Sequence, residues 1–153
     1  MGKIRICTTE DIEKLMEIGE KTFRETFEGE NTQEDMENYC RENFNYEKIS
    51  LEINDKNSRY FVFEEGNQVA GYMKVNFFGS QTEDGYENSL ELQRIYVLKS
   101  YKGKGIGKKF MEAAINLARE NNLEYVWLGV WKHNYKAIEF YKKKGFEEFG
   151  EHV

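Results

Sequence analysis

The sequence has 153 residues, which is enough for one domain with a proper hydrophobic core and too few for two domains of ordinary size. Hydrophobic residues make up 39% of it and aromatic residues 15%, a composition typical of a globular protein and not of a disordered one. The net charge of −6 argues against nucleic acid as the main partner, and no stretch approaches the length of a membrane span. We therefore expect a single domain over residues 1–153, located in the cytoplasm, with no nucleic-acid or membrane partner.

The N-terminal part of the chain predicts one short strand and three helices. Apolar and polar residues alternate at the start, and apolar residues then recur at helical spacing as far as Phe27. Threonine is a preferred N-cap residue, and acidic residues follow it in the first turn. The expected elements are a strand over Lys3–Cys7, a helix capped by Thr8 or Thr9, a helix capped by Thr32 that runs to about Asn43, and a short helix over Tyr46–Ile53.

The remainder of the chain predicts a hairpin followed by alternating strands and helices. The turn Glu65-Gly66-Asn67 joins two antiparallel strands, whereas the later alternation implies crossover connections and parallel pairing. Tyr125–Val130 is continuously apolar, as expected of a strand buried on both faces. The expected strands are Arg59–Glu64, Gln68–Asn76, Ser89–Leu98, Tyr125–Val130 and Phe146–Val153. One helix is expected from Gly105 to about Asn121, and a second over Tyr135–Lys144, with Gly145 as the residue that ends it. The fold class is α/β, with one mixed sheet and helices on both faces.

The loop before the helix at Gly105 has the composition of an anion-binding site. It contains Gly103, Gly105 and Gly107, and the stretch between Leu92 and Met111 has six basic residues and no acidic one. Backbone N–H groups at a helix start and the positive end of the helix dipole favour a negatively charged ligand. The loop therefore predicts a cradle for a phosphorylated molecule. The alternative is a flexible surface loop whose lysines are merely solvated.

Two familiar nucleotide motifs fail on spacing. A P-loop needs four residues between its first glycine and the Gly-Lys-Ser/Thr, but three separate Gly103 from Gly107. The dinucleotide fingerprint needs a third glycine where Lys108 stands, and Glu124 precedes the next strand instead of lying on it. The ligand of the cradle is therefore expected to be of another class.

Charge is distributed unevenly along the chain. Residues 1–91 hold 21 acidic and 10 basic side chains, a balance of −11, whereas residues 92–153 hold 7 acidic and 12 basic ones, a balance of +5. An acidic part and a basic part in one small domain favour two ligands of opposite sign. The alternative is that the surface charge is scattered unevenly by chance.

Two separate motifs resemble those of the GNAT acetyltransferases. Lys102-Gly103-Lys104-Gly105-Ile106-Gly107 after an apolar strand resembles the Arg/Gln-x-x-Gly-x-Gly/Ala loop, which in that superfamily holds the pyrophosphate of acetyl-CoA. The run Val126–Phe146 resembles the second signature, with Asn134 at a helix start and Tyr141 seven residues later. Two motifs in the right order imply the GNAT fold and acetyl-CoA as co-substrate.

The resemblance extends over nearly the whole chain to bacterial spermidine/spermine acetyltransferases of the PaiA type. It is carried by Thr22-Phe23-x-x-Thr26-Phe27, Met36-x-x-Tyr39, Ala70-Gly71-Tyr72-x-Lys74-Val75-Asn76, Leu90-Glu91-x-x-Arg94-Ile95-Tyr96 and Trp127-Leu128-Gly129-Val130-Trp131. Such proteins continue past the position of His152 into another strand, so the final C-terminal strand is expected to be missing here. An uncovered sheet edge invites pairing, so we expect a homo-oligomer through that edge.

The family resemblance implies a role for each motif residue in direct acetyl transfer to a primary amine. Main-chain groups of Ile95, Tyr96 and Val97 would bind the pantetheine arm, and Asn134 would contact it. The hydroxyl of Tyr141 would protonate the departing CoA thiolate. The alternatives are an ordinary helix cap for Asn134 and a core aromatic for Tyr141.

The general base and the acceptor are less fixed by these motifs. Glu91 and Gln93 lie on one face of their strand, and Glu91 is the candidate base, acting through water; the alternative is a structural carboxylate. The spacing of the cysteines and histidines is not that of a metal site, so no metal is expected; these residues are Cys7, Cys40, His133 and His152.

The charge of residues 1–91 suits a polyamine acceptor such as spermidine or spermine. Charge alone does not distinguish a polyamine from an aminoglycoside or a lysine-rich protein tail. Some aromatic residues between Phe23 and Phe44 suit the wall of an acceptor pocket. A non-catalytic CoA-binding regulator is the rival interpretation.

Overall fold

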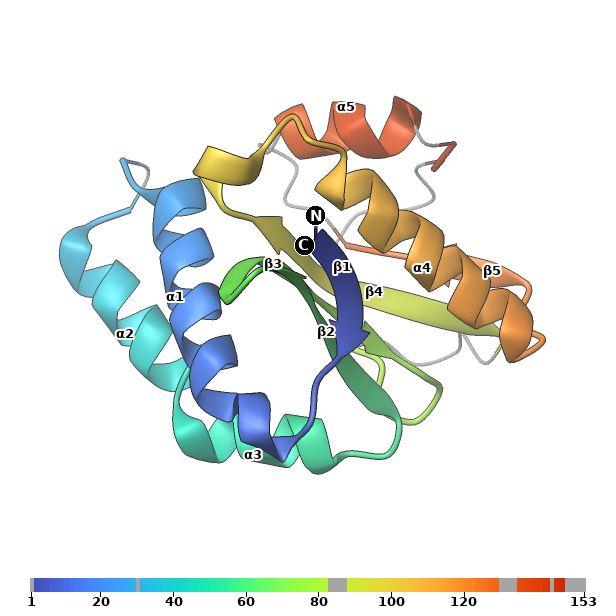
Figure 1. The fold of residues 1–153 in the computed structure, drawn as a ribbon, viewed down its shortest axis with the longest axis horizontal. Coiled ribbons are helices and arrows are strands. Elements are labelled where there is room, and N and C mark those ends of the chain that lie inside the picture. Colours follow the sequence, from blue (N-terminus) through green and yellow to red (C-terminus); the bar gives the residue numbers. More distant parts are fainter. Residues whose placement is uncertain (1, 30, 83–87, 130–134, 144, 148–153) are drawn as a thin grey trace.

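The computed structural model of the chain describes residues 2–29, 31–82, 88–129, 135–143 and 145–147. Five strands form one sheet within this part of the chain, and helices pack on both of its faces (Figure 1). The helices are α1 (Ile12–Phe27), α2 (Gln33–Asn43), α3 (Tyr46–Asn54), α4 (Ile106–Glu120) and α5 (Tyr135–Lys143), with 3₁₀ turns η1 (Thr9–Asp11) and η2 (Lys99–Tyr101). The strands are β1 (Gly2–Ile6), β2 (Ser58–Glu65), β3 (Gln68–Asn76), β4 (Ser89–Val97) and β5 (Tyr125–Trp127).

The predicted caps place the helices correctly. Thr8 and Asp11 form a capping box around η1, so that α1 itself begins one turn later than its cap. The side chain of Thr32 accepts a hydrogen bond from the N–H of Asp35 at 3.1 Å and starts α2. Gly145 follows α5 with a φ of 94°, a left-handed conformation that glycine adopts without strain. Local signals thus determine both ends of several helices.

The sheet has the order β1-β2-β3-β4-β5. β1 to β4 are antiparallel neighbours, and β4 and β5 are parallel, which confirms the predicted mixed sheet. A β-bulge interrupts the pairing of β3 with β4: Lys74 lies opposite Arg94 and Val75 lies opposite Leu92, which leaves Gln93 as the extra residue. The bulge lies in the middle of the sheet, at the site described below.

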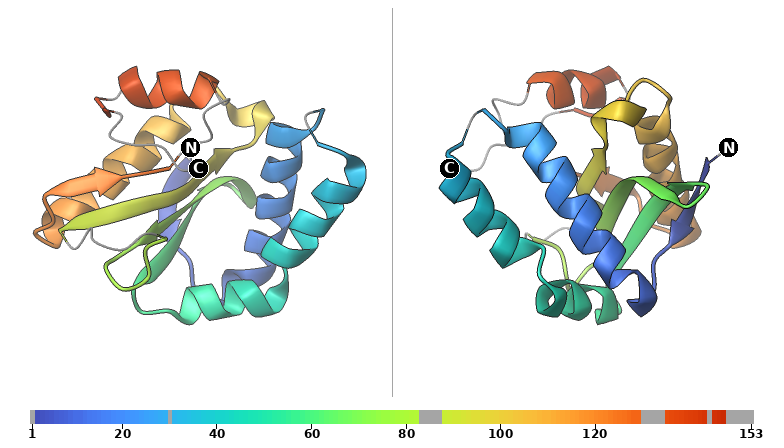
Figure 2. Two further views of the ribbon diagram at one scale, coloured as in Figure 1. Left: turned by 180° about the vertical axis from the view of Figure 1, so that it is seen from behind. Right: turned by 60° about the vertical axis from the view of Figure 1, so that its left-hand side comes forward.

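Two apolar layers enclose the sheet. α1, α2 and α3 cover one face, and α4 covers the other (Figures 1 and 2). The layer under α1–α3 is built on buried residues that include Leu15, Ile18, Ile49, Tyr60 and Tyr72. The layer under α4 includes Met73, Val75, Leu90, Leu92 and Phe110. Alternate residues of β3 and β4 therefore serve opposite layers, as the pleat of a strand requires.

An ion-pair group joins the start of the chain to the hairpin. Arg5 on β1 donates to Asp11 at 2.8 Å and to Glu64 on β2 at 2.8 Å. The hydrogen bond from Arg5 lowers the pKa of Asp11, and it lowers the pKa of Glu64 to about 2. Both carboxylates are therefore ionised at neutral pH and hold β1 and η1 against β2.

The last predicted strands need correction or lie outside the described residues. β5 ends at Trp127 and not at Val130, and Tyr125 is 64% exposed, so the prediction of a strand buried on both faces is wrong there. The reason is that β5 pairs on one side with β4 over only three residues. Residues 148–153 of the predicted strand Phe146–Val153 lie outside the described residues. The uncovered sheet edge predicted at this end of the chain also lies outside them.

Candidate active site

The described pairing of β4 with β5 joins Ser89 to Tyr125, Leu90 to Val126 and Glu91 to Trp127, and β4 continues for six more residues to Val97. The N–H of Leu98 donates to a carbonyl oxygen of β3 at 2.9 Å. Because N–H groups alternate sides along a strand, the main-chain groups of Ile95 and Val97 point to the opposite side, away from β3. This edge of β4 can accept hydrogen bonds from, and donate them to, an extended ligand.

The start of α4 lies at the loop for which the sequence predicts an anion cradle. Gly103 and Gly105 have φ values of 83° and 80°, and no atom lies within 4 Å of the position that a Cβ would take at either. The first intrahelical hydrogen bond runs from the N–H of Lys109 to the carbonyl of Gly105 at 3.1 Å. The three residues between them therefore keep N–H groups without an intrahelical acceptor. Open space and free N–H groups fit a pyrophosphate group.

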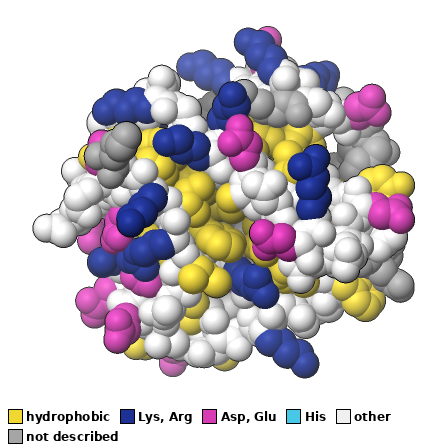
Figure 3. All heavy atoms as spheres, turned by 45° about the vertical axis from the view of Figure 1, so that its right-hand side comes forward, with side chains coloured by type: hydrophobic (Ala, Val, Ile, Leu, Met, Phe, Trp, Pro, Cys, Tyr) yellow, Lys and Arg dark blue, Asp and Glu magenta, His cyan; other side chains and the backbone are white. Residues whose placement is uncertain are grey.

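Positive charge surrounds this cradle. Lys102, Lys104, Lys108 and Lys109 are all exposed. In Figure 3, Lys and Arg side chains predominate along the upper edge of the face, at the height of α5 and the start of α4. Lysines this close to a helix N-terminus add to its attraction for a polyanion.

α5 places Tyr141 beside the same region. The rings of Phe140 and Phe146 lie 5.5 Å and 5.8 Å from its ring, both in edge contact. Burial raises the pKa of the Tyr141 hydroxyl, and Tyr96 on β4 raises it further. Tyr141 is therefore protonated at neutral pH and can act as a proton donor. Asn134, predicted to contact pantetheine, lies outside the described residues.

Glu91 belongs to a buried chain of hydrogen bonds. Its carboxylate accepts from the side-chain amide of Asn76 at 2.9 Å and from the N–H of Thr82 at 2.9 Å, and it also bonds the Thr82 hydroxyl. The side-chain oxygen of Gln93 accepts from Asn76 and from Lys74, both at 2.7 Å. Glu91 and Gln93 thus lie on one face, as predicted, and they also share Asn76 as a hydrogen-bond donor.

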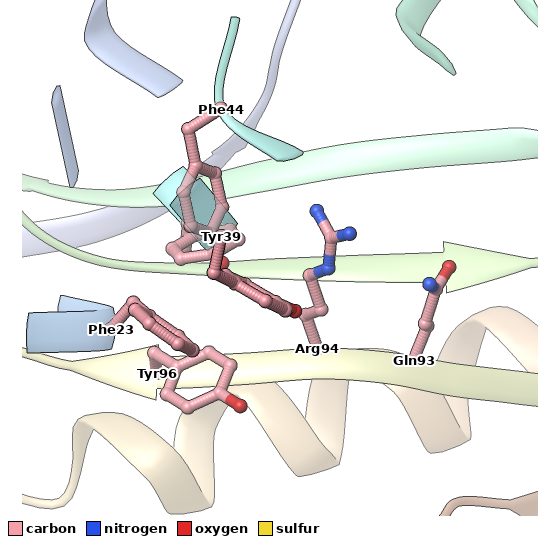
Figure 4. Close-up of a pocket in the computed structure, with 7 residues that line it drawn as sticks. Phe23, Tyr39, Phe44, Gln93, Arg94 and Tyr96 are labelled. Atoms are coloured by element: carbon pink, nitrogen blue, oxygen red, sulfur yellow. The ribbon is translucent and has the colours of Figure 1, made fainter. Parts of the chain in front are cut away.

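An aromatic pocket lies between α1, α2 and β4. Its cavity has a volume of about 170 Å³, and Figure 4 shows the rings and polar side chains that surround it. The rings of Phe23 and Tyr39 are stacked at 4.1 Å. The lining residues are Phe23, Tyr39, Phe44, Tyr72, Gln93, Arg94 and Tyr96. Tyr96 connects this pocket to Tyr141, on whose hydroxyl it acts electrostatically.

No role is predicted from the sequence for Arg94, which lines the pocket. It contributes the positive charge of the pocket, and the cation lies 5.6 Å from the centre of the Phe44 ring. The available signal was an arginine next to Gln93 in a strand whose other charged residue is Glu91. Alternation alone did not show on which face the side chain would lie.

Comparison with known proteins identifies the family. The model of the acetyltransferase (GNAT) family matches residues 13–146. The chain belongs to this GNAT family. It is therefore an N-acetyltransferase, and acetyl-CoA is the co-substrate that the family assignment gives it.

Individual relatives agree with the GNAT assignment over the whole chain. An uncharacterised N-acetyltransferase of Lactobacillus delbrueckii subsp. lactis is 36% identical over 151 residues, covering 99% of this chain and 87% of that protein. The spermidine N(1)-acetyltransferase of Thermoplasma acidophilum is 26% identical over 149 residues, which cover 95% of this chain and 88% of that protein. The crystal structure of the PaiA N-acetyltransferase from Thermoplasma acidophilum in complex with coenzyme A superposes with a TM-score of 0.84 at 24% identity. The superposition covers 96% of this chain and 90% of that one. The fold of this chain is thus a GNAT fold.

The described residues contain no group of three or more His, Cys, Asp or Glu side chains that could hold a metal ion. None of the described helices is long and apolar enough to cross a membrane.

Proposed function

We propose that this GNAT protein transfers an acetyl group from acetyl-CoA directly to the primary amine of a small molecule. The observation that carries the proposal is that main-chain groups of β4 point away from β3 next to the glycine loop before α4. The main-chain groups of Ile95 and Val97 would bind pantetheine, and the N–H groups that start α4, with Lys102, Lys104 and the loop glycines, would bind pyrophosphate.

The proton transfers follow from the groups around this edge. The amine nitrogen attacks the thioester carbonyl, the C–S bond breaks, and the sulfur takes a proton from the Tyr141 hydroxyl. A main-chain N–H at Ile95 or Val97 would stabilise the developing negative charge on the carbonyl oxygen, an interaction typically worth a few kcal/mol. Glu91 is our proposed base, taking the amine proton through a water molecule; the hydrogen bonds from Asn76 and Thr82 hold its carboxylate in place.

A polyamine is the acceptor that the relatives support. The Thermoplasma acidophilum relative is named a spermidine N(1)-acetyltransferase, and residues 1–91 of this chain carry the balance of −11 that would steer a polycation. Spermidine is therefore the first acceptor to assay. Aminoglycosides and lysine-rich peptides are the other amines that the same charge would attract.

The test is release of CoA from acetyl-CoA in the presence of a panel of amines, with acetyl-CoA binding measured in parallel by calorimetry. Acceptor-dependent CoA release is expected. Tight acetyl-CoA binding without turnover on any amine would instead support the rival function, a CoA-binding regulator.

We also propose that the protein forms a homo-oligomer by pairing a sheet edge with that of a second copy, as exposed strand edges readily do. Light scattering after size exclusion measures the oligomeric state, and a monomer at all concentrations contradicts the proposal. The cytoplasmic location expected from the sequence remains a prediction.

A further inference from the structure

The aromatic pocket contains a guanidinium group whose donors are largely unused. Arg94 projects from β4 toward Phe44 and Tyr39 (Figure 4). A guanidinium carries five N–H donors. Within the described residues, the hydrogen bond from Nη1 to the hydroxyl of Tyr60 at 3.2 Å is the one that Arg94 makes. The remaining donors are available to a ligand in the cavity.

The carboxylate that acts on Arg94 is already paired with another cation. Glu52 on α3 attracts Arg94 electrostatically. Its Oε2 atom, however, forms an ion pair with Lys74 at 3.0 Å, and its Oε1 atom accepts from the Tyr60 hydroxyl at 2.9 Å. No ion pair joins Arg94 to an Asp or Glu among the residues that the structure describes. Glu52 thus offsets the charge of Lys74, and the charge of Arg94 remains for a ligand.

The surroundings of Arg94 strengthen its attraction for an anion. Aromatic rings form most of the pocket wall, and such a wall excludes water and lowers the local dielectric constant. The planar fork of a guanidinium matches the two oxygens of a carboxylate, with which it forms paired, charge-assisted hydrogen bonds. A second ammonium group of a polyamine would instead meet a like charge at this position.

We propose that the acceptor of this enzyme carries a carboxylate in addition to the amine, and that Arg94 binds this carboxylate. The inference rests on the proposed acetyl transfer and narrows its acceptor to amines with an acidic group, such as amino acids. Gln93, the extra residue of the bulge beside Arg94, supplies a further polar group to the same wall. The acceptor class differs from the polyamines that the relatives suggest.

The first experiment compares matched acceptors with the unmodified enzyme. β-Alanine, γ-aminobutyrate and phenylalanine are each assayed beside their primary amide, with spermidine as the polycation. Each pair keeps the amine and the chain length and removes only the negative charge. We expect the carboxylate of at least one pair to be favoured in kcat/KM by about 10- to 100-fold, the factor that a charged hydrogen bond commonly supplies.

The second experiment uses Arg94→Met and Arg94→Lys. The ratio of kcat/KM for the carboxylate to that for its amide is expected to approach one in Arg94→Met and to take an intermediate value in Arg94→Lys, which keeps the charge without the fork. Arg59→Met is the matched control, since Arg59 lies over the Phe77 ring at 4.9 Å and outside the pocket lining; it should keep the wild-type ratio. Melting followed by circular dichroism checks that each variant is folded.

The outcomes separate this inference from the proposed function. Turnover of spermidine or the amides, with no carboxylate favoured in any pair, overturns the role of Arg94 and leaves acetyl transfer intact. A preserved ratio in folded Arg94→Met also overturns it. Binding of acetyl-CoA with no turnover on any amine overturns acetyl transfer itself. The wild-type ratios decide the question even where a variant fails to fold.

Discussion

Gln93 and Arg94 are consecutive in β4, yet both side chains line the pocket under α1 and α2. In a regular strand, neighbouring side chains point to opposite faces of the sheet. The bulge between β3 and β4 places an extra residue at Gln93 and so turns two successive polar side chains to one face. The same shift leaves Ile95 and Val97 facing α4, where their side chains pack against the second apolar layer. One inserted residue thus creates the polar wall of the aromatic pocket.

Removing the Tyr141 hydroxyl tests the proton donor. In Tyr141→Phe the ring contacts with Phe140 and Phe146 remain, so the fold and acetyl-CoA affinity should be nearly unchanged. The thiolate would leave without a proton, and kcat should fall by about 10²-fold. Stopped assays with saturating acetyl-CoA measure kcat. Tyr125→Phe, on the exposed side of β5, should keep full activity; an unchanged kcat in Tyr141→Phe would make Tyr141 a packing residue.

A methyl group at Gly105 tests the cradle. The φ of 80° is strained for alanine, which should cost about 1–2 kcal/mol of folding free energy and shift the N–H groups that start α4. We expect a higher KM for acetyl-CoA in Gly105→Ala. Gly66→Ala is the matched control: its φ of 64° carries a similar strain in the β2–β3 turn, so stability should fall and the KM for acetyl-CoA should not. Equal changes in the KM for acetyl-CoA in both variants would contradict a role of the Gly105 loop in binding CoA.

A methyl group at Gly19 tests the pocket wall. A Cβ there would lie 2.5 Å from Cδ1 of Phe44, so the ring must move within the pocket. Alanine is the better helix former, but overpacking of about 1–3 kcal/mol should outweigh that gain of about 1 kcal/mol. We expect Gly19→Ala to melt earlier and to raise the KM of the acceptor, with the KM of acetyl-CoA unaffected. Lys21→Ala, exposed on the same helix, should do neither.

Removing the carboxylate charge tests Glu91 as the base. If Glu91 accepts the amine proton, Glu91→Gln should lower kcat strongly. Glu52→Gln changes the half-buried carboxylate that pairs with Lys74 and should keep kcat. Melting temperatures are needed for both, because the amide of Gln at position 91 would face the amide of Asn76. An unchanged kcat in folded Glu91→Gln would leave Glu91 a structural carboxylate.

The Arg5 group predicts a loss of stability in acid. The pKa values of Asp11 and Glu64 are lowered in the folded protein, so their contribution is complete above about pH 4 and is lost as the pH falls toward 2. Arg5→Gln should cost about 1–2 kcal/mol at pH 7, a modest figure because Arg5 is about one third exposed. Urea titrations across pH should show the two proteins converging near pH 2. Arg24→Gln, in an exposed pair with Glu20, should change stability little at any pH.

The sequence predicted those features that depend on local signals. The cap at Thr32, the turn at Gly66 and the glycines before α4 act through their own backbone, so the ends of α2, β3 and α4 were confirmed within one or two residues. The length of β5 and the face on which the Arg94 side chain lies depend on partners that are distant in sequence. A bulge leaves no periodic signal, because a single extra residue reverses the alternation from which a face is read.

The outward-facing groups of β4 also make the stability of the fold depend on the ligand that we propose for them. A ligand laid along Ile95–Val97 would supply hydrogen bonds that no described strand gives to that edge. Binding of this kind stabilises the folded state by about 2.7 kcal/mol when the ligand is present at 100 times its dissociation constant. Saturating acetyl-CoA would then raise the melting temperature of the protein.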